Sequence, residues 1–495
     1  MRSREAARRN DFVAVLMHLF FLRCRPQGIG QTSREAYEVQ LIHSFYLGTA
    51  GRASGDLEKR WRAGVQRHGE GTGLVRKLAE LRPRPPLLAP QQILARSEHP
   101  RWFSGLVWLT MAVSSIVLFE PAPYDLLVLS SLGAMFLMGL RVPREIHVAV
   151  FLLALFVVGN FAASAASGNP AMTARPLFIR TYMVLSWLLF ACVLTASPGA
   201  MFRVLWQGYT IAALLAVVWG NLGYFGLLPD ALRGPNLYRA SGPFKDANVY
   251  APFLVPVALY TAARIMNSRG PQLGYEIVKM IILVSGLLLA FSRGAWLNFL
   301  FAFTIFMLLQ FASARALGDK VRLVLVAAIL ALTAASVVTF MVTSTTAGQQ
   351  FAARTTLFQE YDTARGGRFD TQGQALRDIG AKPLGVGPGM SASWLGLQPH
   401  NLYLHVTIEG GWIAGIGFVL FLILSLTRGL SRITGQWKHR IDLQVVFAAL
   451  SGTLLQSFFI DSTHWRHLWL LLAMLWALTV AFDRERAAPS TRHSV

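Results

Sequence analysis

The chain has 495 residues, of which 54% are hydrophobic and only 14% are charged. This balance lies outside the range of soluble globular proteins and indicates a membrane protein. The formal net charge is +21, but the sequence has no basic face with interleaved aromatic residues, which argues against a nucleic-acid partner. Cys24 and Cys192 are the only cysteines, and they give neither a metal-binding spacing nor a disulfide framework.

Residues 1–100 are predicted to form a separate basic extension on the cytoplasmic side. Part of it, with Tyr37, Arg52 and Trp61 in a Tyr…Leu-Gly-Arg…Gly…Trp pattern, resembles a small helical module found attached to bacterial surface proteins. A plain basic extension is the alternative. The apolar run Phe12–Leu22 resembles the core of a signal peptide, but no small-x-small cleavage site follows it. We therefore expect the whole segment to stay in the cytoplasm.

From Trp102 onward, the sequence predicts about twelve transmembrane helices, because each crossing of the hydrocarbon core takes roughly 20 apolar residues. Every span should be helical, since open strands leave backbone groups without partners in lipid. The expected spans cover 102–119, 123–140, 146–165, 177–196, 203–224, 247–266, 277–291, 294–312, 321–342, 402–427, 442–460 and 465–482. The predicted fold is an all-α membrane protein with a large loop, 343–400, before the tenth helix.

The charges between the spans predict the topology. If residues 1–101 are cytoplasmic, each short cytoplasmic loop is basic, and the C-terminal tail 485–495 is cytoplasmic as well. The 343–400 loop then lies on the opposite side. Cations on that side run against the usual preference, and an anionic ligand explains them most simply. They are Arg239, Lys245, Arg293, Arg354, Arg365, Arg368 and Arg377, followed by His400 and Asn401.

Four polar blocks fall on this same side. They are Tyr-Arg-Ala-Ser-Gly-Pro-Phe-Lys-Asp-Ala-Asn over 238–248, Ser-Arg-Gly-Ala-Trp over 292–296, the Arg and Gly motifs between Gly366 and Gly389, and Pro-His-Asn-Leu-Tyr over 399–403, followed by Glu-Gly-Gly over 409–411.

In this order, and with a long loop before His-Asn, the blocks resemble the O-antigen ligase family of membrane glycosyltransferases, which includes O-antigen polymerases. The resemblance covers about residues 102–482. Ala247 and Ala414 depart from its signatures, which have Pro and Gly there. The resemblance implies a GT-C-type domain over 101–484, periplasmic loop included. It also implies an enzyme of the bacterial inner membrane that moves a glycan from undecaprenyl diphosphate to a hydroxyl acceptor, lipid A-core in the ligases, at the periplasmic face.

The residue types fit that chemistry. Arginine binds phosphate oxygens with two parallel hydrogen bonds and stays protonated, so the predicted diphosphate-binding residues are Arg239, Arg293, Arg368 and Arg466. An ion pair with Asp370 or Asp362 is the alternative for Arg368. His400 is the predicted catalytic base, placed in the first turn of the tenth span. The positive end of that helix and the nearby arginines should keep its imidazole neutral.

Several polar residues are expected to support this site by holding the ring of His400 or by contacting sugar or acceptor. They are Asn401, Asn248, Lys245, Tyr403, His464 and Asp461. His405 and Glu409 have an i, i+4 spacing and are predicted to pair inside the bundle. No DxD, HExxH or P-loop pattern lies near the blocks, so we expect neither a metal nor another cofactor.

Two other functions remain open. A polymerase that joins repeat units on the same lipid carrier would use the same donor site. A transporter typically shows inverted repeats and charges at the middle of the membrane. Here the charges collect at one face and no repeat is evident. The expected partners are therefore a lipid-linked glycan donor, a glycan acceptor and the bilayer.

Overall fold

The computed structural model describes residues 100–321 and 364–487, apart from 120, 140 and 234–237, together with 323–324, 327–328 and 339. All these residues belong to one compact unit, Gln92–Val495. Four predicted elements lie wholly or partly outside them: the extension before residue 100, most of the 321–342 span, the end of the C-terminal tail, and residues 343–363 of the large loop, which include Arg354 and Asp362.

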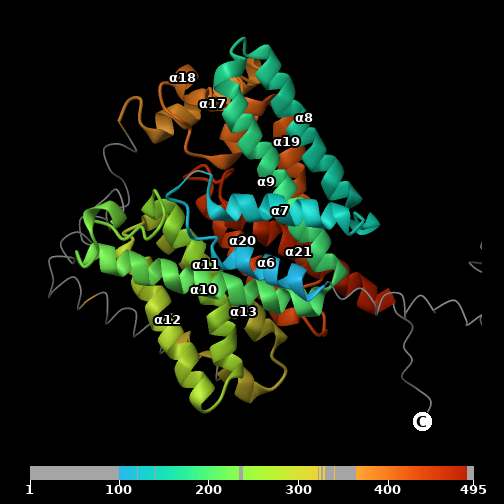
Figure 1. Cartoon of the computed structure of the whole chain (residues 1–495), viewed down its shortest axis with the longest axis vertical. Coiled ribbons are helices and arrows are strands. Elements are labelled where there is room, and N and C mark those ends of the chain that lie inside the picture. The colour runs from blue at the N-terminus through green and yellow to red at the C-terminus, as the bar shows by residue number, and fades with distance from the viewer. Residues whose placement is uncertain are drawn as a thin grey trace, which may run out of the picture. The chain divides into compact units, whose positions relative to one another are not determined.

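The regular structure of the described residues is entirely helical (Figure 1). The α-helices are α6 (Arg101–Ala112), α7 (Pro123–Leu137), α8 (His147–Ala166), α9 (Pro170–Ala196), α10 (Pro198–Tyr224), α11 (Ala247–Asn267), α12 (Pro271–Leu289), α13 (Arg293–Ser313), α17 (Arg368–Ala381), α18 (Ser391–Leu395), α19 (Leu402–Leu430), α20 (Arg440–Gln456) and α21 (Arg466–Ala487). The single-turn 3-10 helices η1 (Arg144–Ile146) and η2 (Asp230–Leu232) lie in connections.

Eight of the described helices are long and apolar enough to cross a membrane, which confirms a multi-pass all-α membrane protein. They are α8 with η1, α9, α10, α11, α12, α13, α19 and α21. The expectation of about twelve full spans is not met within the described residues, because α6, α7 and α20 have only 12, 15 and 17 residues. At a rise of about 1.5 Å per residue, α6 is too short for a hydrocarbon core of about 30 Å.

Serine side chains bond to the backbone at the ends of two of these helices. The Ser114 hydroxyl donates to the carbonyl of Met111, 2.7 Å away, where α6 ends. Such local bonds compete with helix continuation. At the end of α20, Ser457 donates to Thr453, and its own carbonyl accepts from the backbone of Leu402. The start of α19 is therefore attached to the end of α20.

The core is built around α21, most of which is buried against α9, α20 and α19. α19 packs along α8, and the two backbones approach closely at Gly159. A Cβ on Gly159 would lie 2.4 Å from the amide nitrogen of Ala414, so only glycine fits. Close approach at small residues is the usual way in which transmembrane helices associate.

Candidate active site

The first and second polar blocks meet at the starts of α11 and α13. The Asn248 side-chain oxygen accepts hydrogen bonds from the Arg239 guanidinium, at 2.7 Å, and from the Ser292 hydroxyl, at 2.9 Å. The Nε of Arg239 also donates to the carbonyl of Ala290, 2.9 Å away. Asn248 thus holds the Arg239 side chain beside the turn that leads into Arg293.

Arg293 is the first residue of α13 and is half-buried, whereas Lys245 is exposed. The next residue, Gly294, packs against the side chain of Gln456 at the end of α20. The Ser292 turn therefore lies close to the 457–465 connection, which carries Asp461 and His464. Arg239 and Arg293 occur at the same end of the bundle as this connection.

His400 does not lie in the first turn of the tenth span, as the sequence suggested. α19 begins at Leu402, and Asn401 is its N-cap, with its side-chain oxygen accepting from the backbone of Tyr403 and Leu404 at 3.0 and 3.1 Å. His400 precedes the cap and adopts a left-handed backbone with φ of 46°. Helix capping is thus the role of Asn401, and the imidazole of His400 stands outside the helix.

The surroundings of His400 lower its pKa below the ordinary value. Partial burial is the main cause, and the positive charge of Arg368, the first residue of α17, is the second. Asp461 and Asp246 act in the opposite direction. The sequence correctly predicted that the pKa of His400 is lowered and that an arginine contributes to this, but burial lowers the pKa more. The imidazole is therefore predominantly neutral at pH 7.

The glycine-rich part of the third block docks onto a break in α19 at Gly411, where φ is 72°. The Trp412 amide donates to Pro383, while the amides of Val386 and Gly387 donate to the carbonyls of Ile408 and Glu409 at 2.8 and 3.0 Å. A Cβ on Gly411 would lie 2.5 Å from the Pro383 carbonyl oxygen. These glycines thus permit direct contact between two backbones and fix the loop on the helix.

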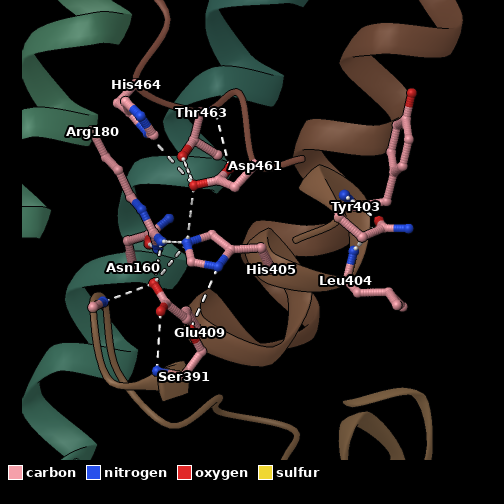
Figure 2. A network of polar contacts seen from close by, with 12 residues as sticks. Asn160, Arg180, Ser391, Tyr403, Leu404, His405, Glu409, Asp461, Thr463 and His464 are labelled. Atoms are coloured by element: carbon pink, nitrogen blue, oxygen red, sulfur yellow. Dashed lines mark hydrogen bonds and ion pairs between the residues drawn. The ribbon is translucent and has the colours of Figure 1, made fainter. Parts of the chain in front are cut away.

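A buried polar network lies directly beside this contact (Figure 2). The Arg180 guanidinium, from α9, forms an ion pair with Glu409 and donates to Asn160 of α8. It also lies 3.1 Å from Nε2 of His405. Glu409 accepts the amides of Gly389 and Ser391, at 2.7 and 3.1 Å, so the same carboxylate holds the loop.

Asp461 connects this network to the surface. One of its oxygens lies 3.3 Å from Nε2 of His405 and 3.6 Å from Nδ1 of His464. Burial alone would raise the pKa of Asp461, but His405 and His464, with the hydrogen bonds around the carboxylate, together lower it well below its usual range. His464 is 54% exposed while Asp461 is buried, so the chain of contacts opens to solvent at His464 (Figure 2).

Residues 278–422 match the profile of the family described as O-antigen ligase. This part of the chain carries an O-antigen ligase domain. No curated protein matches the chain.

The match to the O-antigen ligase domain includes the Ser292 turn, the glycine-rich loop and His400-Asn401. Arg239 and Asn248 precede the matched segment, but they bond to Ala290 and Ser292 inside it. Asp461 follows the segment and affects the pKa of His400 inside it. The site thus draws on residues from both sides of the matched segment.

Arg466 and Tyr403, which the sequence analysis placed in the site, bind other parts of the protein in the structure. Arg466 forms a two-pronged ion pair with Asp125 of α7, at 3.0 and 2.7 Å. The Tyr403 hydroxyl donates to the carbonyl of Leu454, and its ring packs on Phe458 with 4.6 Å between centroids. Both side chains therefore fasten helix ends together.

Arg180, Asn160 and Ser391 were not singled out from the sequence, whereas the predicted pairing of His405 with Glu409 is confirmed at 3.3 Å. Arg180 did carry a signal. It is a lone cation inside an apolar span, and such a residue needs a partner within the bundle. Asn160 and Ser391 carried no comparable signal, because each is an ordinary polar residue whose role depends on helix packing.

Proposed function

We propose that the protein is an O-antigen ligase-like glycosyltransferase. It moves a polysaccharide from undecaprenyl diphosphate to a hydroxyl acceptor, lipid A-core, at the periplasmic face of the bacterial inner membrane. The observation that carries the proposal is the joining of Arg239 to the Ser292-Arg293 turn through Asn248, within a chain that has an O-antigen ligase domain. Two arginines are thereby held at one end of the bundle, where a diphosphate headgroup would lie.

In this proposal the acceptor oxygen forms a bond to the anomeric carbon of the donor sugar. The bond from that carbon to the diphosphate breaks, and its electron pair leaves with undecaprenyl diphosphate. Arg239 and Arg293 stabilise the charge that develops on the bridging oxygen, and Arg368 adds a third positive charge. The diphosphate already activates the sugar, so the proposed reaction uses neither a metal nor another cofactor.

His400 takes the proton of the acceptor hydroxyl. Its lowered pKa supports this role, since a neutral imidazole has a nitrogen lone pair available at pH 7. A left-handed backbone at a residue other than glycine is uncommon, and such backbone strain is concentrated at functional sites. Asp461 affects His400 electrostatically, and His464 lies 3.6 Å from the Asp461 carboxylate. We assign both residues to acceptor or sugar binding.

The proposal includes a topology in which residues 1–100 and the tail 485–495 are cytoplasmic and the site is periplasmic. A polymerase on the same lipid carrier is the alternative that shares this chemistry, and a transporter is the alternative of another class. Deletion of the gene separates them through the surface polysaccharide. Long lipid-linked polymer that accumulates unattached supports a ligase, single unattached repeats indicate a polymerase, and unchanged polysaccharide contradicts both enzymes.

A further inference from the structure

A polar cavity of about 490 Å³ opens at the end of the bundle opposite the candidate active site. It lies where α11 ends at Asn267, where α13 ends at Ser313 and where α20 begins at Arg440. Both α11 and α13 begin at the active-site end, and each is 21 residues long. At about 1.5 Å per residue, a helix of that length crosses a hydrocarbon core, so the cavity lies at the other membrane face.

Three arginines line this cavity, Arg269, Arg315 and Arg440, against one acidic residue, Asp319. Within the part of the chain that the structure describes, none of the three arginines forms an ion pair. Other arginines at this face do have acidic partners. Arg264 lies 3.4 Å from Glu276, and Arg428 lies 2.9 Å from Asp483.

The lining also provides uncharged hydrogen-bond donors and a small apolar part. Asn267, Gln310 and Gln436 line the cavity too. One amide N–H of Asn267 already donates to Ala263 and one of Gln310 to Gln444, which leaves the second N–H of each. Met266 and Leu323 contribute apolar surface. A volume of about 490 Å³ falls within the range of about 300–1,000 Å³ that is usual for ligand sites. Guanidinium groups together with amide donors match the oxygens of a phosphate group.

We propose that this cavity binds the phosphate-bearing headgroup of an anionic membrane phospholipid. Its position at helix ends puts it at the depth of the headgroups, where basic pockets between transmembrane helices bind such lipids. Basic residues at a membrane face often serve topology alone. The distinguishing observation here is that three arginines without acidic partners converge on one cavity. Arg144 is exposed, as Arg269 and Arg315 are, and has no described acidic partner either, but it lies outside the lining and serves as the control.

The test uses the purified full chain in detergent. Binding of phosphatidylglycerol is measured by native mass spectrometry and by the shift in melting temperature, with phosphatidylcholine and inorganic phosphate as comparison ligands. We expect phosphatidylglycerol to bind and stabilise the protein more than phosphatidylcholine does. The double variant Arg269→Gln/Arg315→Gln should weaken binding by about tenfold or more, whereas Arg144→Gln should leave it unchanged.

A charge-preserving variant keeps the result independent of folding. Arg315→Lys retains the cation but not the planar pair of donors, so we expect an intermediate loss of binding with an unchanged melting temperature in the absence of lipid. If Arg144→Gln lost as much phosphatidylglycerol binding as the double variant, the proposal would be overturned, because the binding would then depend on surface charge in general and not on the cavity. Stabilisation by inorganic phosphate equal to that by phosphatidylglycerol would also overturn it, and would identify free phosphate as the ligand.

Discussion

Arg180 and Glu409 are 229 residues apart in the sequence and form an ion pair whose side chains are only 6% and 0% exposed. The pair joins α9 to α19 beside the loop that leads to His400. Glu409 also accepts two amides from that loop, those of Gly389 and Ser391. A contact between two helices therefore also determines where the loop lies, and we infer that it positions His400 indirectly.

Replacing Arg180 should destabilise the protein more than it alters the chemistry. Arg180→Met removes the guanidinium partner of a buried carboxylate, and breaking such a pair typically costs about 3–5 kcal/mol. We expect a lower melting temperature in detergent, whereas Arg377→Met, on the exposed side of α17, should have little effect. In a cycle with Glu409→Gln, the two changes should be non-additive. Additive effects would mean that the ion pair does not couple these residues.

The docking of the glycine-rich loop can be tested at two glycines that both have a left-handed backbone. A Cβ on Gly411 would meet the Pro383 carbonyl oxygen at 2.5 Å, whereas a Cβ on Gly396, with φ of 80°, meets nothing within 4 Å. Gly396→Ala should therefore cost only the backbone strain of about 1–2 kcal/mol. Gly411→Ala should cost clearly more and lower the yield of folded protein. Equal melting temperatures for the two variants would contradict the docking described above.

The long apolar helices could be predicted from the sequence because their signal is local. Hydropathy over about 20 residues identified α8, α11 and α13 to within a residue or two. The same signal overestimated α20, whose Gln444 and Gln456 are buried and hydrogen-bonded to α13 rather than facing lipid. A hydropathy window cannot distinguish burial in protein from burial in lipid.

Contacts between residues close in the chain could be predicted from their spacing, whereas contacts with distant helices could not. The pairing of His405 with Glu409 followed from their spacing. The pKa of His400 is lowered mainly by burial, which the sequence did not show. Arg466 was predicted to bind the diphosphate because it lies in a polar turn on the same side as the other site residues. Its ion pair with Asp125, 341 residues away, could not be seen in the sequence. Only the packing of α7 against the start of α21 reveals that pair.

The proposed topology predicts that α17 and the C-terminal tail lie on opposite sides of the membrane. In a background with Cys24→Ser and Cys192→Ser, Arg377→Cys provides an exposed thiol on α17, and Ser490→Cys provides one in the tail. A membrane-impermeant maleimide added to cells with a permeabilised outer membrane should label position 377 only. Labelling of both positions, or of position 490 alone, would reject the topology and with it the proposed periplasmic site.

The arginine hypothesis predicts that charge alone is insufficient at Arg293. Arg293→Lys keeps the cation but loses the paired donors, so glycan transfer should fall by about tenfold or more at normal protein levels. Arg377→Lys provides the matched control on the same face and should transfer at the wild-type rate. Arg239→Lys should lose activity and also some stability, because Arg239 bonds Ala290 and Asn248. Wild-type transfer by Arg293→Ala would remove that residue from the site.

His400 provides the sharpest test of the chemistry. His400→Ala should leave donor binding largely intact and reduce turnover by about 10²–10⁴-fold if the imidazole is the general base. His400→Gln retains a hydrogen-bonding group without a basic nitrogen. It should therefore keep partial activity if the residue only orients the acceptor, and almost none if it accepts the proton. Wild-type turnover in His400→Ala would exclude both roles.

The pH dependence of glycan transfer tests whether His400 is the group that titrates. Because burial and Arg368 lower the pKa of His400, the neutral base is present at pH 7, and activity should fall only as the pH drops through a value below about 6.5. Arg368→Gln removes one of the causes that lower it, so the pKa of His400 should rise and the acidic limb of the profile should move to higher pH. Arg377→Gln, farther along α17, should not move it. An acidic limb that stays in place in Arg368→Gln, with donor binding retained, would show that the titrating group is not His400.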